Sequence, residues 1–266
     1  MAMAALGRKL WRLGLFLLWM WPFALWSLLF AVGGRGGIRR VARCTRKWGR
    51  FLTRAIHIKV EFLCDHEVPE GVLIVSNHQG YIDVLVHAAL FPIRFAPKAE
   101  IRRWPVLGCY LAISRPVWID RSSRQKSRNV LEEFRRTLND GVSLLVYPEG
   151  TSTDGRHGLL PFKSTPFETV IGTRYQIQPV ITRYEIGADG WTPAWFGDQT
   201  LLPHVWALLG RKEIRARVAA LPLVTVEPGE DRKQLAARIE AMMQAAENDR
   251  RLLFPAESKG CPAMAD

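Results

Sequence analysis

The sequence predicts an α/β protein, with a mixed sheet flanked by helices and a pair of helices at the N-terminus. Short runs of branched apolar residues at 72–75, 143–147 and 177–184 are typical of buried strands. Segments with helical spacing alternate with these runs, which is the pattern of a layered α/β structure. The 266 residues suffice for one domain and an appendage. We therefore expect N-terminal membrane-anchoring helices at 1–60, a globular domain at 61–255 and a tail at 256–266.

The first apolar segment contains no charged residue from 13 to 34 and is long enough to cross a bilayer. Pro22 lies in its middle, where it would kink a helix. Basic residues flank both ends, so the positive-inside rule gives no orientation. A full span and a kinked helix that dips into one leaflet both remain open. Cleavage as a signal peptide is not expected, because the apolar run is too long.

A Gly-rich hinge at 33–37 leads into a second predicted helix at 38–56. Apolar residues recur there at spacings of three and four, and seven Lys or Arg fill most of the other positions. One interpretation is a solvated basic face over a packed apolar face. We favour a helix that lies on anionic lipid, because no acidic residue is expected to pair with these charges.

The net charge of +12 lies entirely in residues 1–60, which contain twelve Lys or Arg and no Asp or Glu. The rest of the chain is neutral, which argues against nucleic acid as a partner and favours membrane lipids. The four cysteines show neither paired nor metal-like spacing. We therefore expect reduced thiols and a location at the cytoplasmic face of a bacterial-type inner membrane.

Strands and helices are predicted to alternate through the globular part. Pro92, Pro97 and Pro105 follow a short helix at 84–90 and favour a short strand, a turn and a short helix over one long helix. Ser122 or Ser123 is expected to cap the next helix. The later elements that we expect are a strand at 116–121, a helix at 124–138, a strand at 143–147, a helix at 164–175, a strand at 177–184, an irregular segment at 185–212, one or two edge strands at 214–227 and a helix at 231–250.

The predicted strand at 72–75 is followed by Ser76 and Asn77, whose side chains are able to cap a helix. His78 and Asp83 come next. Five residues along a helix turn about 140° net, so these two side chains share no helical face. They meet only if His78 lies on the loop or cap and Asp83 on the first turns. An imidazole beside a carboxylate is the minimum for a general base, and the alternative is a capping or surface histidine.

Four sequence blocks then follow in an order that resembles the glycerolipid acyltransferase family. Residues 77–83 are similar to its NHxxxxD block, and residues 117–121, which end in Arg121, are similar to its second block. Residues 147–151, Tyr-Pro-Glu-Gly-Thr, resemble its FPEGTRS block, and residues 178–180 resemble its short fourth block. The resemblance covers about residues 60–185 and favours a catalytic role for His78.

The resemblance implies direct transfer of an acyl group from acyl carrier protein or a coenzyme A thioester to the hydroxyl of a lysolipid. His78 would act as the general base, and Asp83 would fix its tautomer. Arg121 would hold the acceptor head group. Backbone N–H groups near Gly150 are candidates for stabilising the oxyanion. The other expected substrate-binding residues are Glu149, Gly150, Thr151 and Lys163.

No protein nucleophile and no cofactor is expected, because the sequence contains neither a G-x-S-x-G pattern nor a phosphate-binding glycine loop. A metal is not expected either, since HExxH and CxxC patterns are absent. The other histidines have no ligand-like neighbours in sequence: His57, His66, His87, His157 and His204.

One departure from the family pattern bears on the acceptor. Ser152 stands where the third block usually has Arg, a residue that is expected to help hold an acceptor phosphate. 1-Acyl-sn-glycerol-3-phosphate is still the first expected acceptor, because it dominates the family. A lyso-ornithine lipid is the second, because variants that lack this Arg include enzymes similar to lyso-ornithine lipid acyltransferases. A membrane-associated lipid hydrolase, with water as the nucleophile, is a more distant alternative.

Overall fold

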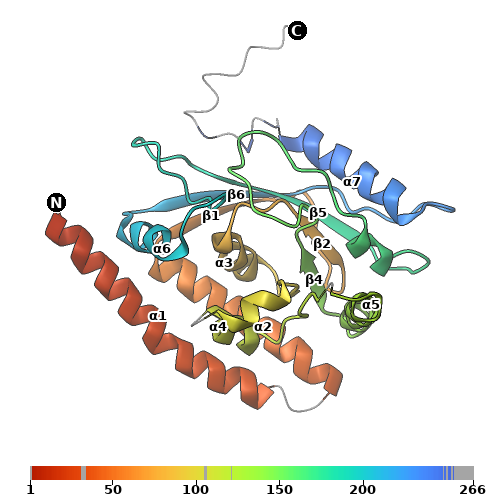
Figure 1. The fold of residues 1–266 in the computed structure, drawn as a ribbon, viewed down its shortest axis with the longest axis horizontal. Coiled ribbons are helices and arrows are strands. Elements are labelled where there is room, and N and C mark those ends of the chain that lie inside the picture. Colours follow the sequence, from red (N-terminus) through yellow and green to blue (C-terminus); the bar gives the residue numbers. More distant parts are fainter. Residues whose placement is uncertain are drawn as a thin grey trace, which may run out of the picture.

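A computed structural model places a six-stranded mixed sheet at the centre of the chain, with helices on both faces (Figure 1). The predicted fold class is therefore confirmed. The structure describes residues 2–30, 34–104, 107–120, 122–247, 249, 251–252 and 254. The predicted tail at 256–266 lies outside the described residues.

The strand order in the sheet is β1-β6-β5-β2-β4-β3. Neighbouring strands are parallel except for β5 and β6, which are antiparallel. Because β2, β4 and β5 run in the same direction, their carboxyl ends meet at one edge of the sheet. The strands are β1 (Ile58–Leu63), β2 (Leu73–Ser76), β3 (Ile93–Phe95), β4 (Ser143–Val146), β5 (Ile177–Tyr184) and β6 (Ile214–Ala220).

The helices form successive layers on one face of the sheet and a single layer on the other. α3 lies directly on the first face, and α2 and then α1 lie outside it (Figure 1). α5 and α7 share the core on the opposite face. The helices are α1 (Ala2–Phe30), α2 (Gly34–Ala55), α3 (Tyr81–Leu90), α4 (Leu107–Ile113), α5 (Arg124–Asn139), α6 (Leu201–Gly210) and α7 (Arg232–Glu247), with 3₁₀ turns η1 (Ala99–Arg103) and η2 (Thr165–Thr169).

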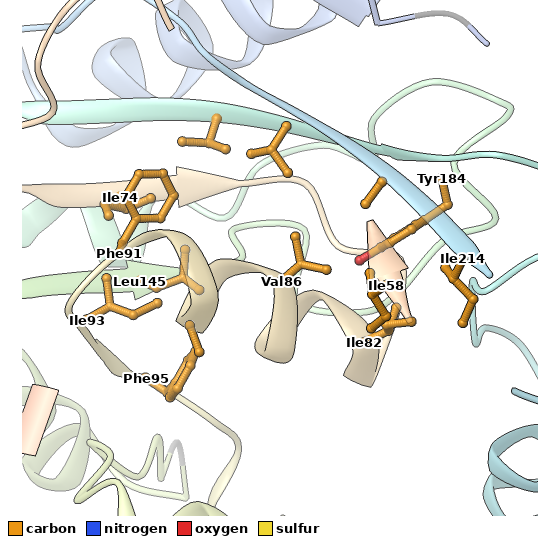
Figure 2. Close-up of a cluster of buried hydrophobic side chains, with 14 of the residues drawn as sticks. Ile58, Ile74, Ile82, Val86, Phe91, Ile93, Phe95, Leu145, Tyr184 and Ile214 are labelled. Atoms are coloured by element: carbon orange, nitrogen blue, oxygen red, sulfur yellow. The ribbon is translucent and has the colours of Figure 1, made fainter. Parts of the chain in front are cut away.

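Strand residues alternate between two cores, as the period of two in a strand requires. On β2, Ile74 packs into the core on the α3 side, whereas Leu73 and Val75 pack into the core on the α5 and α7 side. Figure 2 shows the core on the α3 side, which includes Ile82 and Val86 of α3. Burial on both faces explains why the central strands read as continuous apolar runs.

α2 buries its apolar face against α3 and α1, so this face is not free to lie on lipid. Its buried residues include Val41, Trp48 and Leu52. Most of its basic residues are exposed, and Arg43 forms an ion pair with Glu70 at 3.4 Å, which corrects the expectation that these charges have no acidic partner. α2 also begins at Gly34, so the predicted Gly-rich hinge is helical from that residue onward.

α1 is one continuous helix with Pro22 inside it, so the proline does not end the helix. It is the one helix among the described residues that is long and apolar enough to cross a membrane, by length and composition. Its mean hydropathy reaches 1.8, yet only 11% of this apolar window is buried. Most of the apolar surface of α1 is therefore exposed.

Several predicted elements of the globular part are observed. β4 and β5 lie where strands were predicted. The three prolines are followed by β3, η1 and α4, as expected. The side chain of Ser123 accepts a hydrogen bond from the Lys126 N–H at the start of α5, which selects Ser123 over Ser122 as the cap.

Other predicted elements differ from those observed. The expected strand at 116–121 forms only an isolated bridge, between Ile119 and Lys98, because Pro97 and Pro116 have no N–H to extend a ladder. The expected helix at 164–175 is the short turn η2, after which Gly172 adopts a φ of 68°. α6 lies within the segment expected to be irregular, and β6 lies between β1 and β5 rather than at an edge.

The close crossing of α2 and α3 generates a stability prediction. A Cβ at Gly49 would lie 2.7 Å from the Ala88 carbonyl carbon. Gly49→Ala is expected to lower the free energy of unfolding by about 1–3 kcal/mol through this overlap, although Ala favours a helix over Gly. Denaturant unfolding in detergent micelles measures the change.

Gly14→Ala in α1 is the matched control, because nothing lies within 4 Å of a Cβ at that position. We expect this variant to be neutral or more stable by up to about 1 kcal/mol. A Gly49→Ala protein that behaves like the control would show that the two helices do not require this close contact.

Candidate active site

The carboxyl edge of β2, β4 and β5 brings the two expected catalytic residues together. His78 lies on the loop after β2, and Asp83 lies in the first turn of α3. His78 Nδ1 is 2.8 Å from Asp83 Oδ2. This is the one arrangement in which a spacing of five residues allows the two groups to meet. The His78 side chain keeps 23% of its surface exposed and Asp83 keeps none, so only the imidazole is reachable from solvent.

Asp83 is a fully buried carboxylate that accepts four hydrogen bonds. Besides His78, the N–H groups of Gln79 and Gly80 donate to Oδ2 at 2.6 and 3.0 Å, and the Tyr184 hydroxyl donates to Oδ1 at 2.6 Å. An acidic residue in the first turn ordinarily satisfies such free N–H groups at a helix start. Burial acts to raise the pKa of Asp83. The hydrogen bond and charge of His78, together with smaller effects of His87 and Tyr184, outweigh burial, so the pKa is lowered. Asp83 is therefore ionised at neutral pH.

Asn77 fixes the loop that carries His78 to the neighbouring strand. Its side-chain N–H donates to the Thr182 carbonyl at 2.9 Å, and its side-chain oxygen accepts from the Thr182 N–H at 2.8 Å. The expectation that Ser76 and Asn77 cap the helix is therefore wrong, because the cap is Gly80 with Asp83 as its acceptor. Gly80 has a φ of 146°, and a Cβ there would lie 2.9 Å from the Trp195 nitrogen, so glycine is required.

Glu149 holds the same loop from the other side. Its Oε1 atom accepts from the His78 N–H at 2.8 Å, and its Oε2 atom accepts from the Leu160 N–H at 3.0 Å. Burial raises the pKa of Glu149, and these backbone hydrogen bonds act in the opposite direction. We expected Glu149 to bind substrate. In the structure both carboxylate oxygens accept from backbone donors, one of which belongs to His78.

The other expected substrate-binding residues lie at the rim of the site or outside the described chain. Gly150 adopts a φ of 73°, and a Cβ there would lie 2.2 Å from Lys163 Nζ, so glycine allows Lys163 to approach this turn. The Gly150 N–H donates to the Tyr147 carbonyl at 3.1 Å, which removes it as an oxyanion donor. Thr151 and Lys163 are exposed. Arg121 lies outside the described residues.

Three side chains with no predicted role surround the pair. Tyr184 binds Asp83, and the ring of Tyr147 stacks on the His78 ring with centroids 4.0 Å apart and planes at 18°. His87 lies one helical turn after Asp83 and is fully buried. The spacing of four between Asp83 and His87 was readable in the sequence as a shared helical face. The contacts to Tyr147 and Tyr184 depend on strand pairing, which no local pattern specifies.

The described residues contain a second histidine–aspartate pair, which lacks the features of a catalytic base. His157 Nδ1 lies 2.7 Å from Asp154 Oδ2, but 86% of the His157 side chain is exposed. No backbone donor or stacked ring fixes that imidazole within the described part of the chain. In that same part, no group of three or more His, Cys, Asp or Glu side chains is arranged to hold a metal ion.

A reachable imidazole that a buried carboxylate orients at a sheet edge can remove a proton from a hydroxyl group, which is a step that acyl transfer needs. A family described as Acyltransferase matches residues 57–183, from the start of β1 to the end of β5. The chain belongs to this family and is an acyltransferase. The matched segment contains both His78 and Asp83.

The chain is similar to two kinds of curated relative. The chain is similar to the 1-acyl-sn-glycerol-3-phosphate acyltransferase of Neisseria meningitidis, with 31% identity over 185 residues that cover 69% of this chain and 72% of that protein. It is also similar to the lyso-ornithine lipid O-acyltransferase of Brucella abortus, with 32% identity over 195 residues that cover 66% of this chain and 72% of that protein.

The fold is also that of a solved structure, the 1-acyl-sn-glycerophosphate acyltransferase PlsC from Thermotoga maritima. The TM-score is 0.67, the identity is 16%, and the match covers 95% of this chain and 98% of that chain. At this identity the likeness is one of fold. It extends beyond the family segment to nearly the whole of both chains.

The environment of Asp83 predicts how stability depends on pH. Because its pKa is lowered on folding, its ionised form adds stability that is present above the ordinary pKa of 3.8 and lost as pH falls through the folded value. Asp83→Asn is expected to lower the free energy of unfolding at pH 7 by about 1–3 kcal/mol, because the amide faces other donors. Urea unfolding at pH 7 and pH 3 should show this difference narrowing at the lower pH.

Asp189→Asn is the control. The Asp189 carboxylate is exposed, and its pKa is also lowered, mainly by a hydrogen bond from Arg211. Its effect on stability should stay small at both pH values. A loss in Asp83→Asn that is the same at pH 7 and pH 3 would show that the charge of Asp83 is not what stabilises the fold.

Proposed function

We propose that the protein is a membrane-bound O-acyltransferase of phospholipid biosynthesis. It moves a fatty acyl group from an acyl thioester, carried by acyl carrier protein or coenzyme A, to the free hydroxyl of a lysolipid. The main support is the His78–Asp83 pair, at 2.8 Å, with the imidazole exposed and the carboxylate buried. No separate cofactor is part of the proposal.

The hydrogen bond to Asp83 determines which imidazole nitrogen acts. Nδ1–H donates to Asp83, so the lone pair of Nε2 is left for the acceptor hydroxyl. Nε2 takes the hydroxyl proton while the oxygen bonds to the thioester carbonyl carbon, which gives a tetrahedral intermediate with a negatively charged oxygen. The carbonyl then re-forms, the C–S bond breaks, and the imidazolium returns the proton to the thiolate. The products are an ester and a thiol, and His78 is neutral again.

The proposed acceptor is 1-acyl-sn-glycerol-3-phosphate, and the product is phosphatidic acid. Similarity to the Neisseria protein supports this choice. Lys163 at the rim, together with Thr151 and Arg121, is the proposed binding set for the phosphate. A lyso-ornithine lipid is the second candidate, because Ser152 stands where the third block usually has Arg. Several similar proteins are also named lyso-ornithine lipid O-acyltransferases.

We infer that α1 lies in the plane of one leaflet rather than across the bilayer. Both ends of the helix contact the globular part. Near its start, Arg8 and Arg12 donate to carbonyl groups of Gly210 and Leu209 at 3.0 Å each, and near its end Ser27 donates to the Ile113 carbonyl. A spanning helix would move one of these ends away from the globular part by up to about 30 Å.

The outward side of α1 has the composition of an interfacial helix, with large apolar side chains and several tryptophans. The free cysteines Cys44, Cys64 and Cys109 support the cytoplasmic face of an inner membrane. The large exposed side chains of α1 are Met3, Leu6, Leu10, Trp11, Leu17, Leu18, Trp19, Trp21, Leu25, Trp26, Leu28 and Leu29.

A competition assay tests the reaction and the acceptor together. The protein in detergent micelles receives one labelled acyl thioester and equal amounts of lysophosphatidic acid and lyso-ornithine lipid. We expect label mainly in phosphatidic acid, and a loss of about 10²–10⁴-fold in His78→Ala. His157→Ala, which removes the exposed pair, should keep wild-type activity. Release of free fatty acid without an acceptor would instead identify a hydrolase, and label mainly in ornithine lipid would identify the second acceptor.

Spin labels test the position of α1. In a variant without native cysteines, labels replace Leu10, Leu18 and Leu25, which are exposed and span about 22 Å along the helix. A helix in the plane gives the three labels the same depth in vesicles, whereas a spanning helix places the middle label deepest. A label at the exposed Arg54 of α2 reports the aqueous reference. A depth maximum at residue 18 would refute the in-plane position.

A further inference from the structure

The face of the His78 imidazole is covered by a ring that the acyl-transfer steps do not use. The Tyr147 ring lies almost parallel to it, at 18° and with 4.0 Å between centroids. Tyr147 follows Leu145 by two residues, and Leu145 faces the core on the α3 side. The alternation of the strand therefore brings the Tyr147 ring to the side where α3 and His78 lie.

The hydroxyl end of Tyr147 is bound to a second histidine. The Tyr147 oxygen lies 2.9 Å from His87 Nδ1, and His87 Nε2 lies 2.8 Å from the Thr182 hydroxyl and 3.3 Å from the Ser76 hydroxyl. His87 is fully buried. These contacts join the ends of β2, β4 and β5 to the middle of α3, so the Tyr147 ring is held at both of its ends.

One set of protonation states satisfies this chain of hydrogen bonds. Burial raises the pKa of Tyr147 well above its ordinary value, with the charge of Asp83 acting in the same direction, so the phenol keeps its proton and donates it. Burial lowers the pKa of His87 to about 4. The charge of Asp83 acts to raise this pKa and the charge of His78 acts to lower it, and the net result is that His87 is neutral. Nδ1 of His87 then accepts from Tyr147, and its Nε2–H donates to Thr182.

The stacked ring matters when His78 is protonated. In the acyl-transfer step the imidazole becomes an imidazolium, and a cation over the face of a tyrosine ring is stabilised by the ring quadrupole. This contact strengthens only as the proton arrives, so it favours the transition state over the ground state. A neutral His87 adds no positive charge that would oppose it.

The Tyr147 hydroxyl departs from the family pattern that the sequence blocks resemble. The third sequence block, which usually begins with Phe, begins here with Tyr147, and a Phe at this position would have no group to bind His87. His87 lies four residues after Asp83, on the same face of α3. One helix therefore supplies both the carboxylate that binds the edge of the His78 ring and the imidazole that binds the hydroxyl of Tyr147.

We propose that His87 is a positioning residue of the acyltransferase, which holds the Tyr147 ring flat against His78 so that this ring stabilises the imidazolium formed during acyl transfer. The proposal rests on the proposed role of His78 as the general base. It assigns a function to a buried histidine whose side chain is out of reach of the substrate.

A set of variants tests the proposal by kinetics. Tyr147→Leu removes the ring and is expected to lower kcat roughly 3- to 30-fold with little change in KM. It should also move the acid limb of the kcat/KM profile to lower pH, because a less stabilised imidazolium loses its proton more readily. His87→Leu and Tyr147→Phe should each lower kcat by a smaller factor. The double variant His87→Leu/Tyr147→Phe should lower kcat no further than either single variant, because the two groups act as one unit.

Tyr81→Phe is the matched control. Its hydroxyl lies 2.9 Å from Nδ1 of another histidine, His204, so the variant loses a tyrosine–histidine hydrogen bond of the same kind. We expect its kcat and acid limb to match the wild type. Unchanged kcat and an unchanged acid limb in Tyr147→Leu and His87→Leu, with only a lower melting temperature, would show that the network serves packing alone and overturn the proposal.

A measurement without turnover separates this proposal from the proposed function. Carbon-13 labelling of the histidine rings, with His78→Ala to assign the signal, follows the protonation of His78 by nuclear magnetic resonance. The transition should move to lower pH in Tyr147→Leu and stay in place in Tyr81→Phe. This result supports the ring contact even if acyl transfer by His78 is disproved, and an unmoved transition overturns the contact even if acyl transfer is confirmed.

Discussion

The site depends on a buried charge that must be fully compensated. A carboxylate without water is strongly destabilised unless donors surround it. Asp83 has four donors, and they come from the loop after β2, the start of α3 and the last residue of β5. Moving any one of these elements would leave part of the charge unsatisfied. The requirement to solvate Asp83 therefore fixes the relative positions of α3, β5 and the His78 ring.

The groups packed around this carboxylate are held neutral. Burial raises the pKa of Tyr147 and Tyr184 well above their ordinary values, and burial lowers that of His87. The charge that changes during the proposed reaction is then the one on His78, which faces a fixed negative charge at its edge and a ring over its face. Such fixed dipoles and charges need no rearrangement when the proton moves, which is how preorganised sites lower a barrier.

The sequence predicted the features that local patterns determine. Continuous apolar runs indicated β2, β4 and β5, and the spacing of five between His78 and Asp83 required a loop and a helix start. β1 was not predicted, because its residues are mostly half-buried or exposed and lack the apolar run of a central strand. α6 was missed because its sequence, LLPHVWALLG, has no polar face and contains Pro203. The contacts of Tyr147, Tyr184 and Glu149 required tertiary positions that spacing alone does not give.

β6, which is parallel to β1 and antiparallel to β5, joins an early and a late segment of the chain. Ile58 of β1 pairs with Ile214 of β6, and Arg12 of α1 donates to a carbonyl at the end of α6. β1 and α1 are synthesised long before their partners in β6 and at α6. Such distant pairings slow folding because a long loop must close first. The early apolar helix can therefore meet a membrane while the rest of the enzyme is unfinished, and the sheet is complete only when β6 is available.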